Sequence, residues 1–337
     1  MRALIRWIVR IIAGLLVLIL LVALAGAVFQ TVASRSGAKK FPPPGRMIPV
    51  GDHALHALIK GDGGPTVVFD SALGASHLSW SLVQPAVSGF TRACAYDRAG
   101  IGWSEPGPKP RTSGRAVDEL REMLRKAGLN PPYVLVGNSI GGLNMRLYAL
   151  RYPGEVAGLV LVDSVHEDQD ARLPASARLD PSFVKTLSLF RWGTRIGLPR
   201  VMNMPLGEGS SPLLPAELKP AARAAGFRNS WIDATYRETV GLEASYTEVR
   251  SARKARPDPP LGDLPLIVLG RGLKPDETPD GEKTLKIWTE LQKELAAESR
   301  RGEFQVVDGS GHFIQAERPE AVIAAIRKIV DLIRGLS

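Results

Sequence analysis

The sequence has little cysteine and, over its first 46 residues, no acidic side chain at all. Cys94 is the single cysteine among 337 residues, which excludes an intrachain disulfide and argues against a cysteine-rich zinc or iron–sulfur site. Internal repeats are also absent. With 45% hydrophobic and 23% charged residues, the chain has a globular composition, so disorder is excluded as its dominant state.

The net charge of +9 comes from 43 Lys and Arg against 34 Asp and Glu, and it first suggests a nucleic acid or an anionic membrane as partner. Seven of the basic residues lie within residues 1–46: Arg2, Arg6, Arg10, Arg35, Lys39, Lys40 and Arg46. The other 36 nearly balance the 34 acidic residues, which leaves +2 for residues 47–337. Because these charges are not interleaved with aromatic side chains, we expect no nucleic-acid partner.

Residues 11–29 form an uncharged run of 19 residues rich in Leu, Ile and Val. At about 1.5 Å per residue, such a helix crosses a hydrocarbon core of roughly 30 Å. We therefore predict that residues 1–30 are a transmembrane anchor and that the chain meets the membrane through residues 11–29. A signal peptide is the alternative, because the small-x-small triplets at 23–25 and 25–27 fit a cleavage site, and cleavage would give a secreted protein.

The three N-terminal arginines favour a cytoplasmic N-terminus and an extracytoplasmic body, although Arg35, Lys39 and Lys40 oppose this orientation. We expect the extracytoplasmic placement. Residues 31–46 follow as a predicted linker, because Ser, Gly and Lys discourage a packed core and three consecutive prolines stiffen the chain as polyproline II. The folded domain is predicted over residues 47–337.

Short β-branched runs bounded by Gly, Asp or Pro predict six strands, at 66–71, 91–97, 133–138, 158–164, 266–271 and 303–308. Their nearly continuous hydrophobicity is typical of parallel strands buried on both faces. Helical patterns such as Val117–Ala127 and Pro319–Arg334 separate most of them, which predicts an α/β fold with a mostly parallel central sheet and helices on both faces. Residues 47–50 and 54–60 predict an antiparallel hairpin on the sheet edge.

Between Asp163 and Leu266 no strand pattern occurs, so we predict a helical lid over about residues 167–260, inserted after the sixth strand. The lid contains a cluster of apolar residues: Leu187, Leu189, Phe190, Trp192, Ile196, Leu198, Val201, Met202, Met204 and Leu206. We favour packing of these side chains against the sheet. The alternatives are an acyl-chain pocket and a surface that dips into the bilayer beside the anchor.

Ser139 lies in Gly137-Asn138-Ser139-Ile140-Gly141, which matches the pattern G-x-S-x-G. The bare pattern is a weak signal, but here a predicted strand (YVLVG) precedes it and a helical segment (GLNMRLYALRYP) follows. A sharp strand–turn–helix connection lifts a serine hydroxyl clear of the sheet edge, and the two glycines allow helix and strand to approach closely. Ser139 is therefore the candidate nucleophile.

Further stretches accompany this motif in order over about residues 47–337: FPPPGRMIPVGDHALHALIKG, TVVFDSALGASHLSW, ACAYDRAGIGWS, VAGLVLVDSVHED and DGSGHFIQAERPEAV. With them the chain resembles the α/β-hydrolase fold superfamily, and within it bacterial, serine esterase-like members that carry a membrane leader. The lid matches only by position. These motifs are specific for the fold and say little about the substrate.

The resemblance implies a catalytic histidine in the Gly-rich loop after the last strand, where this chain has His312 in DGSGHF. His312 would take the Ser139 proton as general base. The other four histidines carry weaker expectations: surface or edge roles for His53 and His56, a pocket-border position for His77, and no assigned role for His166.

Two residues are candidates for the triad acid. Many members of the superfamily carry the acid shortly after the strand at 266–271, but here no carboxylate occurs in that loop before Asp276. Others carry it at the end of the preceding strand, where this chain has Asp163. We favour Asp163, because a carboxylate at the C-terminal end of a parallel strand points to the site, and Asp276 stays open.

The oxyanion hole of such an enzyme needs two backbone N–H groups. We expect one from Ile140 and one from Leu73, in a loop that reads Ser-Ala-Leu-Gly where the superfamily commonly has His-Gly. In the following loop, Asp97 and Arg98 predict a structural ion pair or loop brace, and Trp103 is a candidate for the pocket lining.

These residues together predict a serine hydrolase that cleaves an ester-like bond, in a small-molecule or lipid ester, through an acyl-enzyme. A Ser nucleophile argues against dehalogenase or epoxide-hydrolase chemistry, which in this fold begins with carboxylate attack. No metal or organic cofactor is implied. The alternatives are a non-catalytic binding protein on the same fold, and a peptidase or C–C bond hydrolase with the same triad.

Overall fold

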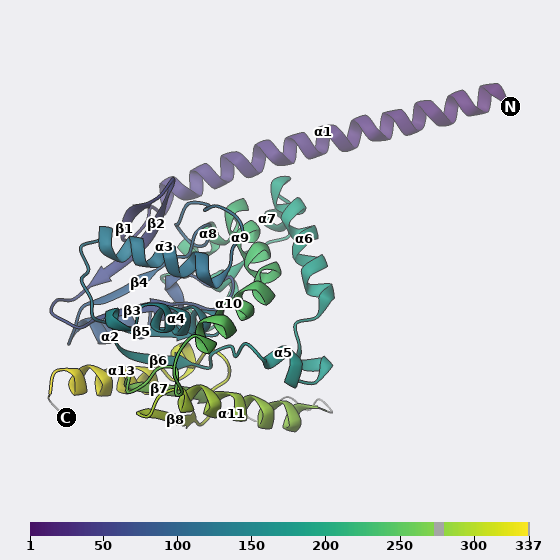
Figure 1. The fold of residues 1–337 in the computed structure, drawn as a ribbon. Helices are drawn as coiled ribbons and strands as arrows, with labels where there is room; N and C mark the ends of the chain where they lie inside the picture. The colour runs from purple at the N-terminus through teal and green to yellow at the C-terminus, as the bar shows by residue number, and fades with distance from the viewer. Residues whose placement is uncertain (273–279, 336–337) are drawn as a thin grey trace.

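The central feature of the fold is one eight-stranded sheet with the order β1-β2-β4-β3-β5-β6-β7-β8 (Figure 1). The computed structural model describes residues 1–272 and 280–335. Its strands are Arg46–Val50 (β1), His53–Lys60 (β2), Thr66–Asp70 (β3), Ala93–Tyr96 (β4), Tyr133–Asn138 (β5), Val156–Val162 (β6), Leu266–Arg271 (β7) and Gly302–Val307 (β8). The pairs β1–β2 and β2–β4 are antiparallel and the others parallel, which confirms the predicted edge hairpin and the mostly parallel sheet.

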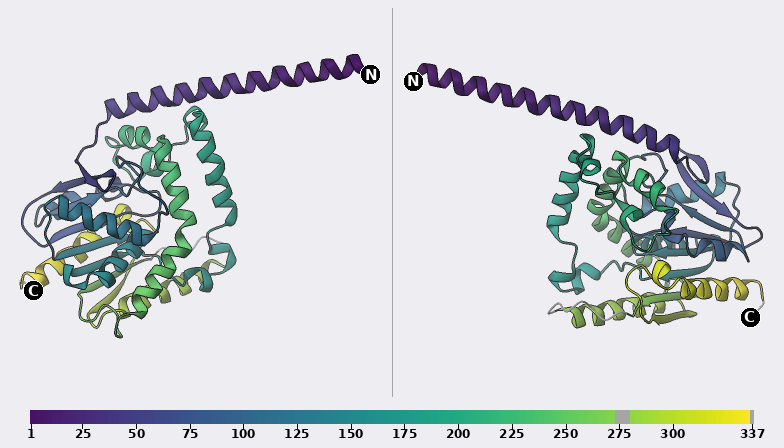
Figure 2. Two further views of the ribbon diagram at one scale, coloured as in Figure 1. Left: turned by 45° about the horizontal axis from the view of Figure 1, so that its top comes forward. Right: turned by 180° about the vertical axis from the view of Figure 1, so that it is seen from behind.

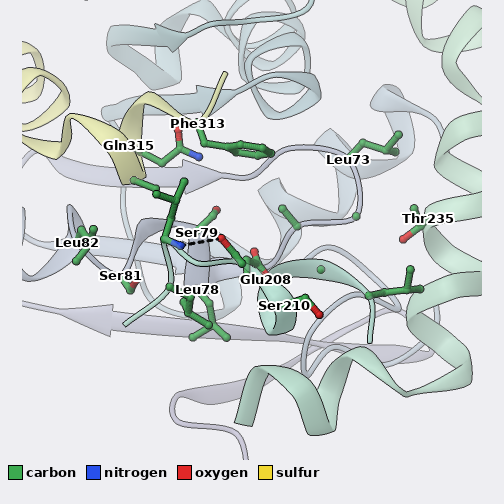
Figure 3. A pocket seen from close by; sticks show the side chains of 18 of the residues that line it. Leu73, Leu78, Ser79, Ser81, Leu82, Glu208, Ser210, Thr235, Phe313 and Gln315 are labelled. Carbon is green, nitrogen blue, oxygen red and sulfur yellow. Dashed lines mark hydrogen bonds between the residues drawn. The ribbon is translucent and has the colours of Figure 1, made fainter. Parts of the chain in front are cut away.

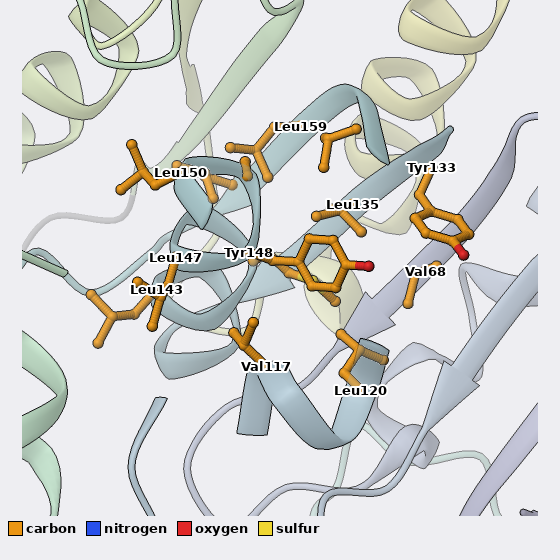
Figure 4. Packing of buried hydrophobic residues seen from close by; sticks show 14 of the residues in the cluster. Val68, Val117, Leu120, Tyr133, Leu135, Leu143, Leu147, Tyr148, Leu150 and Leu159 are labelled. Atoms are coloured by element: carbon orange, nitrogen blue, oxygen red, sulfur yellow. The ribbon is translucent and has the colours of Figure 1, made fainter. Parts of the chain in front are cut away.

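Helices cover both faces of this sheet, and side chains alternate between them along each strand. On β5, Leu135 packs with α3 (Ser113–Lys126) and α4 (Ile140–Arg151), as Figure 4 shows. Its neighbours Val134 and Val136 pack on the opposite face with α2 (Gln84–Ser88) and α13 (Pro319–Ile333). Burial on both faces explains why the central strands β4, β5 and β6 contain no charged residue.

A helical lid lies between β6 and β7, where residues 163–265 contain helices and turns but no strand. Its helices are Gln169–Arg172 (α5), Pro181–Arg195 (α6), Leu198–Val201 (α7), Lys219–Gly226 (α8), Asn229–Val240 (α9) and Leu242–Lys254 (α10). Beyond β7 lie α11 (Gly281–Ala297) and α12 (Ile314–Glu317). The lid thus occupies the position predicted for it.

The packing predicted for the apolar cluster of the lid is wrong. Leu187 is buried, but seven of the ten side chains are exposed: Leu189, Trp192, Ile196, Leu198, Val201, Met202 and Met204. The reason is that α6 packs against α9 rather than against the sheet, so that its outer face has no neighbour in the domain.

The N-terminal helix α1 (Arg2–Lys40) is long and apolar enough to cross a membrane, and its most apolar window is not buried in the domain. It is continuous through Lys40, so the predicted linker at 31–46 is wrong for residues 31–40. Packing on the lid stabilises this part of the helix: Gln30 is buried and donates to the Phe227 carbonyl (2.7 Å), and Gly37 lies against Ala224. Only the segment after Lys40, before β1, is irregular.

Candidate active site

Ser139 occupies a strained turn between β5 and α4, with φ 58° and ψ −122°. The two flanking glycines make this turn possible. A Cβ on Gly137 would lie 2.4 Å from the Gly141 backbone, and one on Gly141 would lie 2.4 Å from the Asp70 carbonyl oxygen. A non-glycine residue at positive φ costs of order 1–3 kcal/mol and persists only where the surroundings fix it, as in a nucleophile elbow.

Asp163 and His312 form a close contact at the same end of the sheet. Asp163 follows β6, is fully buried, and its Oδ2 accepts from His312 Nδ1 at 2.6 Å. Its Oδ1 accepts from Trp288 Nε1 (2.7 Å) and from the Arg271 backbone N–H (3.2 Å). Burial alone would raise the pKa of Asp163, but the hydrogen bond from His312 and the Arg271 charge hold it below its usual value.

Asn138 ties the His312 loop to the turn that carries Ser139. Its amide donates to the carbonyls of Val162 (2.9 Å) and His312 (3.1 Å), and Gln315 donates to its side-chain oxygen (3.1 Å). The structure therefore brings Asp163 and His312 together beside the residue that precedes Ser139. The alternative acid, Asp276, lies outside the described residues.

Sequence reasoning missed three side chains of this region: Asn138, Trp288 and Gln315. Asn138 occupies an unspecified position of the G-x-S-x-G pattern, so only its place beside Ser139 could have indicated a role in the site. Trp288 comes from α11, far along the chain from Asp163, and nothing in its local sequence distinguishes it from a core tryptophan.

The loop after β3 holds Leu73 through contacts with Arg98. The Arg98 guanidinium donates to the carbonyls of Ser71 (2.6 Å) and Ala72 (2.9 Å). Arg98 is itself held by Asp70 and Glu238, not by Asp97. The loop-brace interpretation is thus confirmed for Arg98, which holds the two residues that precede Leu73.

Ile140 is the first residue of α4, where backbone N–H groups have no acceptor within the helix. Its amide is therefore available to a ligand at the end of the sheet. Ile140 and Leu73 remain the candidate oxyanion-hole donors.

An apolar cavity of about 440 Å³ borders this region (Figure 3). Leu73 and Phe313, the neighbour of His312, contribute to its wall, and the lid adds Phe183 and Leu187. Among the described residues that line it, Glu208 alone has an ionisable side chain. Trp103 and His77 do not line this cavity, contrary to expectation, because they pack against each other and His56.

Glu208 is partly exposed and receives hydrogen bonds from Ser76, at 2.7 Å from the backbone N–H and 3.1 Å from the hydroxyl. Burial raises its pKa to about 7, and the nearby Asp97 charge acts in the same direction. Loss of water around the carboxylate outweighs the two hydrogen bonds, which favours the neutral acid.

His56, His77 and Asp97 form a buried group with metal-ligand residue types. Both histidines contact Asp97 through Nδ1, each at 2.9 Å, and the Gly45 N–H donates to His56 Nε2 at 3.0 Å. This last bond requires a lone pair on Nε2, so the proton sits on Nδ1 and is donated to Asp97. The Asp97 carboxylate therefore links β2, which carries His56, to the segment after β3, which carries His77.

His53, His56 and His166 are all buried. His53 and His56 lie on β2 in the hairpin at the sheet edge, so the expected edge role is confirmed, but both side chains are buried and the surface role is wrong. Burial, with help from the Arg146 charge, lowers the pKa of His166 to about 4, and its neighbour Glu167 pairs with Arg146.

Comparison with known proteins identifies relatives of the chain. The model of the alpha/beta hydrolase family matches residues 67–325. An AB hydrolase superfamily protein of Gibberella zeae is 25% identical over 293 residues, which cover 80% of this chain and 87% of that protein. An uncharacterized protein of Schizosaccharomyces pombe is 28% identical over 236 residues, 68% of this chain, but the match spans only 39% of that longer protein.

Solved structures show the same fold at lower identity. An esterase from Thermogutta terrifontis is 19% identical with a TM-score of 0.60, covering 86% of this chain and 98% of its own. The epoxide hydrolase CorEH is 17% identical, also with a TM-score of 0.60, covering 84% of this chain and 97% of its own. The fold is thus shared by proteins of different chemistry. Because the family model covers most of the domain, the chain belongs to the α/β-hydrolase family.

Proposed function

We propose that this α/β-hydrolase is a serine hydrolase that cleaves ester-like bonds with Ser139 as nucleophile, His312 as base and Asp163 as acid. The observation that carries the proposal is the 2.6 Å contact between His312 Nδ1 and the buried Asp163, beside the strained turn of Ser139. A third group that orients the base of a nucleophilic serine defines the triad arrangement.

The proposed mechanism follows from this geometry. The His312 Nδ1–H donates to Asp163, which leaves Nε2 to accept the Ser139 proton while Oγ attacks the ester carbonyl. The N–H groups of Ile140 and Leu73 would stabilise the oxyanion. His312 then protonates the leaving alcohol, an acyl-enzyme forms on Ser139, and water activated by His312 releases the acid.

The apolar cavity supports an acyl group as the substrate part bound beside Leu73 and Phe313. Serine in the elbow supports ester hydrolysis over epoxide-hydrolase or dehalogenase chemistry, for which a carboxylate nucleophile is needed.

We extend the proposal to the domains: residues 47–337 form the hydrolase domain, and α1 stays attached as a membrane anchor. Cleavage after residue 25 or 27 would sever α1 near Gly26, where its backbone meets Ile196. The extracytoplasmic orientation stays a prediction.

Labelling with a fluorophosphonate probe tests the nucleophile. Wild type and Ser251→Ala, an exposed serine on α10, should label, and Ser139→Ala should not. Thermal unfolding of each variant establishes that it is folded. Absence of Ser139-dependent labelling would instead favour a non-catalytic binding protein. A panel of acyl esters against peptide amides and C–C substrates then separates the ester hydrolase from the peptidase and C–C hydrolase alternatives.

A further inference from the structure

The apolar part of α1 ends in contact with the lid. A Cβ on Gly26 would lie 2.3 Å from the Ile196 carbonyl oxygen, and one on Gly197 would lie 3.2 Å from the Phe29 ring. Gly26 and Phe29 both belong to the uncharged run at 11–29. At about 1.5 Å per residue, Gly26 lies roughly 5 Å inside the end of that run. If the run spans the hydrocarbon layer, the turn between α6 and α7 lies at the boundary of that layer.

Polar contacts begin immediately after this point. Arg200 Nε donates to Gln30 Oε1 (3.0 Å), and the same guanidinium donates to Ser34 Oγ (3.2 Å). The Gln30 amide in turn donates to the lid backbone at Phe227. The contacts of α1 with the lid therefore change from apolar to polar where the uncharged run at 11–29 ends.

The outer surface of the lid beside this contact is apolar. We define the α6–α7 face as its exposed side chains Leu189, Trp192, Ile196, Leu198, Val201 and Met202. Leu189 and Val201 are each 72% exposed. The helix α6 carries basic residues but no acidic one, and the Arg195 guanidinium lies 4.4 Å from the centroid of the Trp192 ring. Basic residues beside exposed Trp and Leu are typical of a helix that lies in a membrane interface.

Figures 1 and 2 place this helix in the required orientation. In each view α6 lies on the side of the domain toward which the N-terminal half of α1 projects, and it runs crosswise to α1. A membrane crossed by α1 would therefore have α6 along its surface.

We propose that the α6–α7 face is seated in the headgroup–acyl boundary of the bilayer that α1 crosses. An apolar surface of this kind on a soluble domain marks an interaction site, and α1 holds it at membrane depth. Because α6 also supplies Phe183 and Leu187 to the cavity, the membrane-facing helix is a wall of that cavity. It follows, on the basis of the proposed hydrolase function, that the substrate is an ester that partitions into the bilayer.

Depth-dependent quenching tests the seating without reference to activity. The full chain with Cys94→Ala and a single new cysteine, Leu189→Cys or Val306→Cys, is labelled with the fluorophore NBD in phosphatidylcholine–phosphatidylglycerol vesicles. Val306 is the matched control: it is 50% exposed and lies on β8, away from α1 in Figure 1. We expect doxyl-labelled lipids to quench the probe at 189 and not at 306. Equal quenching at both sites would overturn the proposal, as would a blue-shifted probe at 189 without lipid quenching, which would indicate a protein partner.

Charge substitution tests the consequence for substrate access. Leu189→Asp should lower hydrolysis of a long-chain ester dissolved in the vesicles about tenfold, since burying one Leu is worth at least that factor. Its hydrolysis of a soluble short-chain ester should be unchanged, and Val306→Asp should alter neither rate. An unchanged rate on the membrane ester would contradict the seating. If wild type hydrolyses neither ester, the proposed function fails, while quenching at 189 still decides the seating.

Discussion

The end of the sheet that carries Ser139 and the α6–α7 face of the lid differ in how many contacts their side chains make within the chain. At the sheet, both oxygens of the buried Asp163 have donors within the chain, and the strained Ser139 turn is fixed by contacts of Gly137 and Gly141 with neighbouring backbone. On the lid, Leu189 and Val201 have no comparable neighbours. Contacts within the chain therefore hold the first region in place, whereas we propose that the bilayer covers the second.

The strongest test of this comparison changes Asp163. If Ser139, His312 and Asp163 form the proposed triad, Asp163→Asn should lower ester turnover about 10³–10⁴-fold, because the amide favours the wrong tautomer of His312. Steady-state kinetics with a soluble ester measures this effect. Asp276→Asn, the alternative acid, should keep wild-type turnover. The reverse result would move the acid to Asp276.

Much of the site at the end of the sheet that carries Ser139 could be predicted from the sequence, because short local segments determine its conformation. The strand before Ser139, the glycines around it and the carboxylate at the end of β6 all lie in short segments whose chemistry limits their conformation. The supporting hydrogen bonds could not be predicted. Trp288 reaches Asp163 across 125 positions of sequence, and only the packing of α11 on the sheet brings them together.

Trp288 offers the next largest effect. Trp288→Phe keeps the buried ring but removes the 2.7 Å hydrogen bond to Asp163, and a hydrogen bond to a charged group is worth about 1.5–3 kcal/mol. We expect turnover to fall about tenfold and the free energy of unfolding to drop by a similar energy. Trp192→Phe, the matched control on the lid surface, should leave both unchanged in detergent with a soluble ester. A silent Trp288→Phe would show that the other donors suffice to orient Asp163.

The lid and the end of α1 were less predictable for a physical reason. Hydrophobicity alone does not distinguish a side chain that packs in a core from one that faces lipid, so the packing prediction for residues such as Leu189 was wrong. Similarly, the Ser, Gly and Lys content of residues 31–40 indicated a linker, but contacts of Gln30 and Gly37 with the lid stabilise a helix there. Tertiary packing overrode weak local preference in both segments.

Substitutions at two glycines of α1 test the contact between α1 and the lid separately from membrane insertion. Gly26 meets the Ile196 backbone, whereas a Cβ on Gly14 would have nothing within 4 Å. We expect Gly26→Leu to push α1 from the lid and to lower the free energy of unfolding by about 1–2 kcal/mol, as overpacking does. Gly14→Leu should have no effect. Thermal unfolding and limited proteolysis of the lid in detergent measure both, and equal behaviour of the two variants would contradict a docked α1.

The smallest expected effect concerns Glu208, the carboxylate that the lid places beside the cavity. Its pKa of about 7 in the folded chain exceeds its ordinary value of 4.5, so between these pH values the folded chain holds a proton that the unfolded chain releases. Folding stability should therefore fall as pH rises from about 4.5 to about 7.

Glu208→Gln keeps an acceptor for the Ser76 N–H and removes this titration. The variant should match wild type at pH 4 and exceed it by about 1 kcal/mol at pH 8, a value reduced from the full shift because Glu208 is partly exposed. Chemical denaturation across this pH range measures the difference, with the exposed Glu217→Gln as control. A constant difference between Glu208→Gln and wild type would mean that the carboxylate is ionised in the folded chain. The lid would then stabilise a charge beside its apolar cavity much as the sheet does at Asp163, and the contrast between the two regions would be limited to the outer face of α6 and α7.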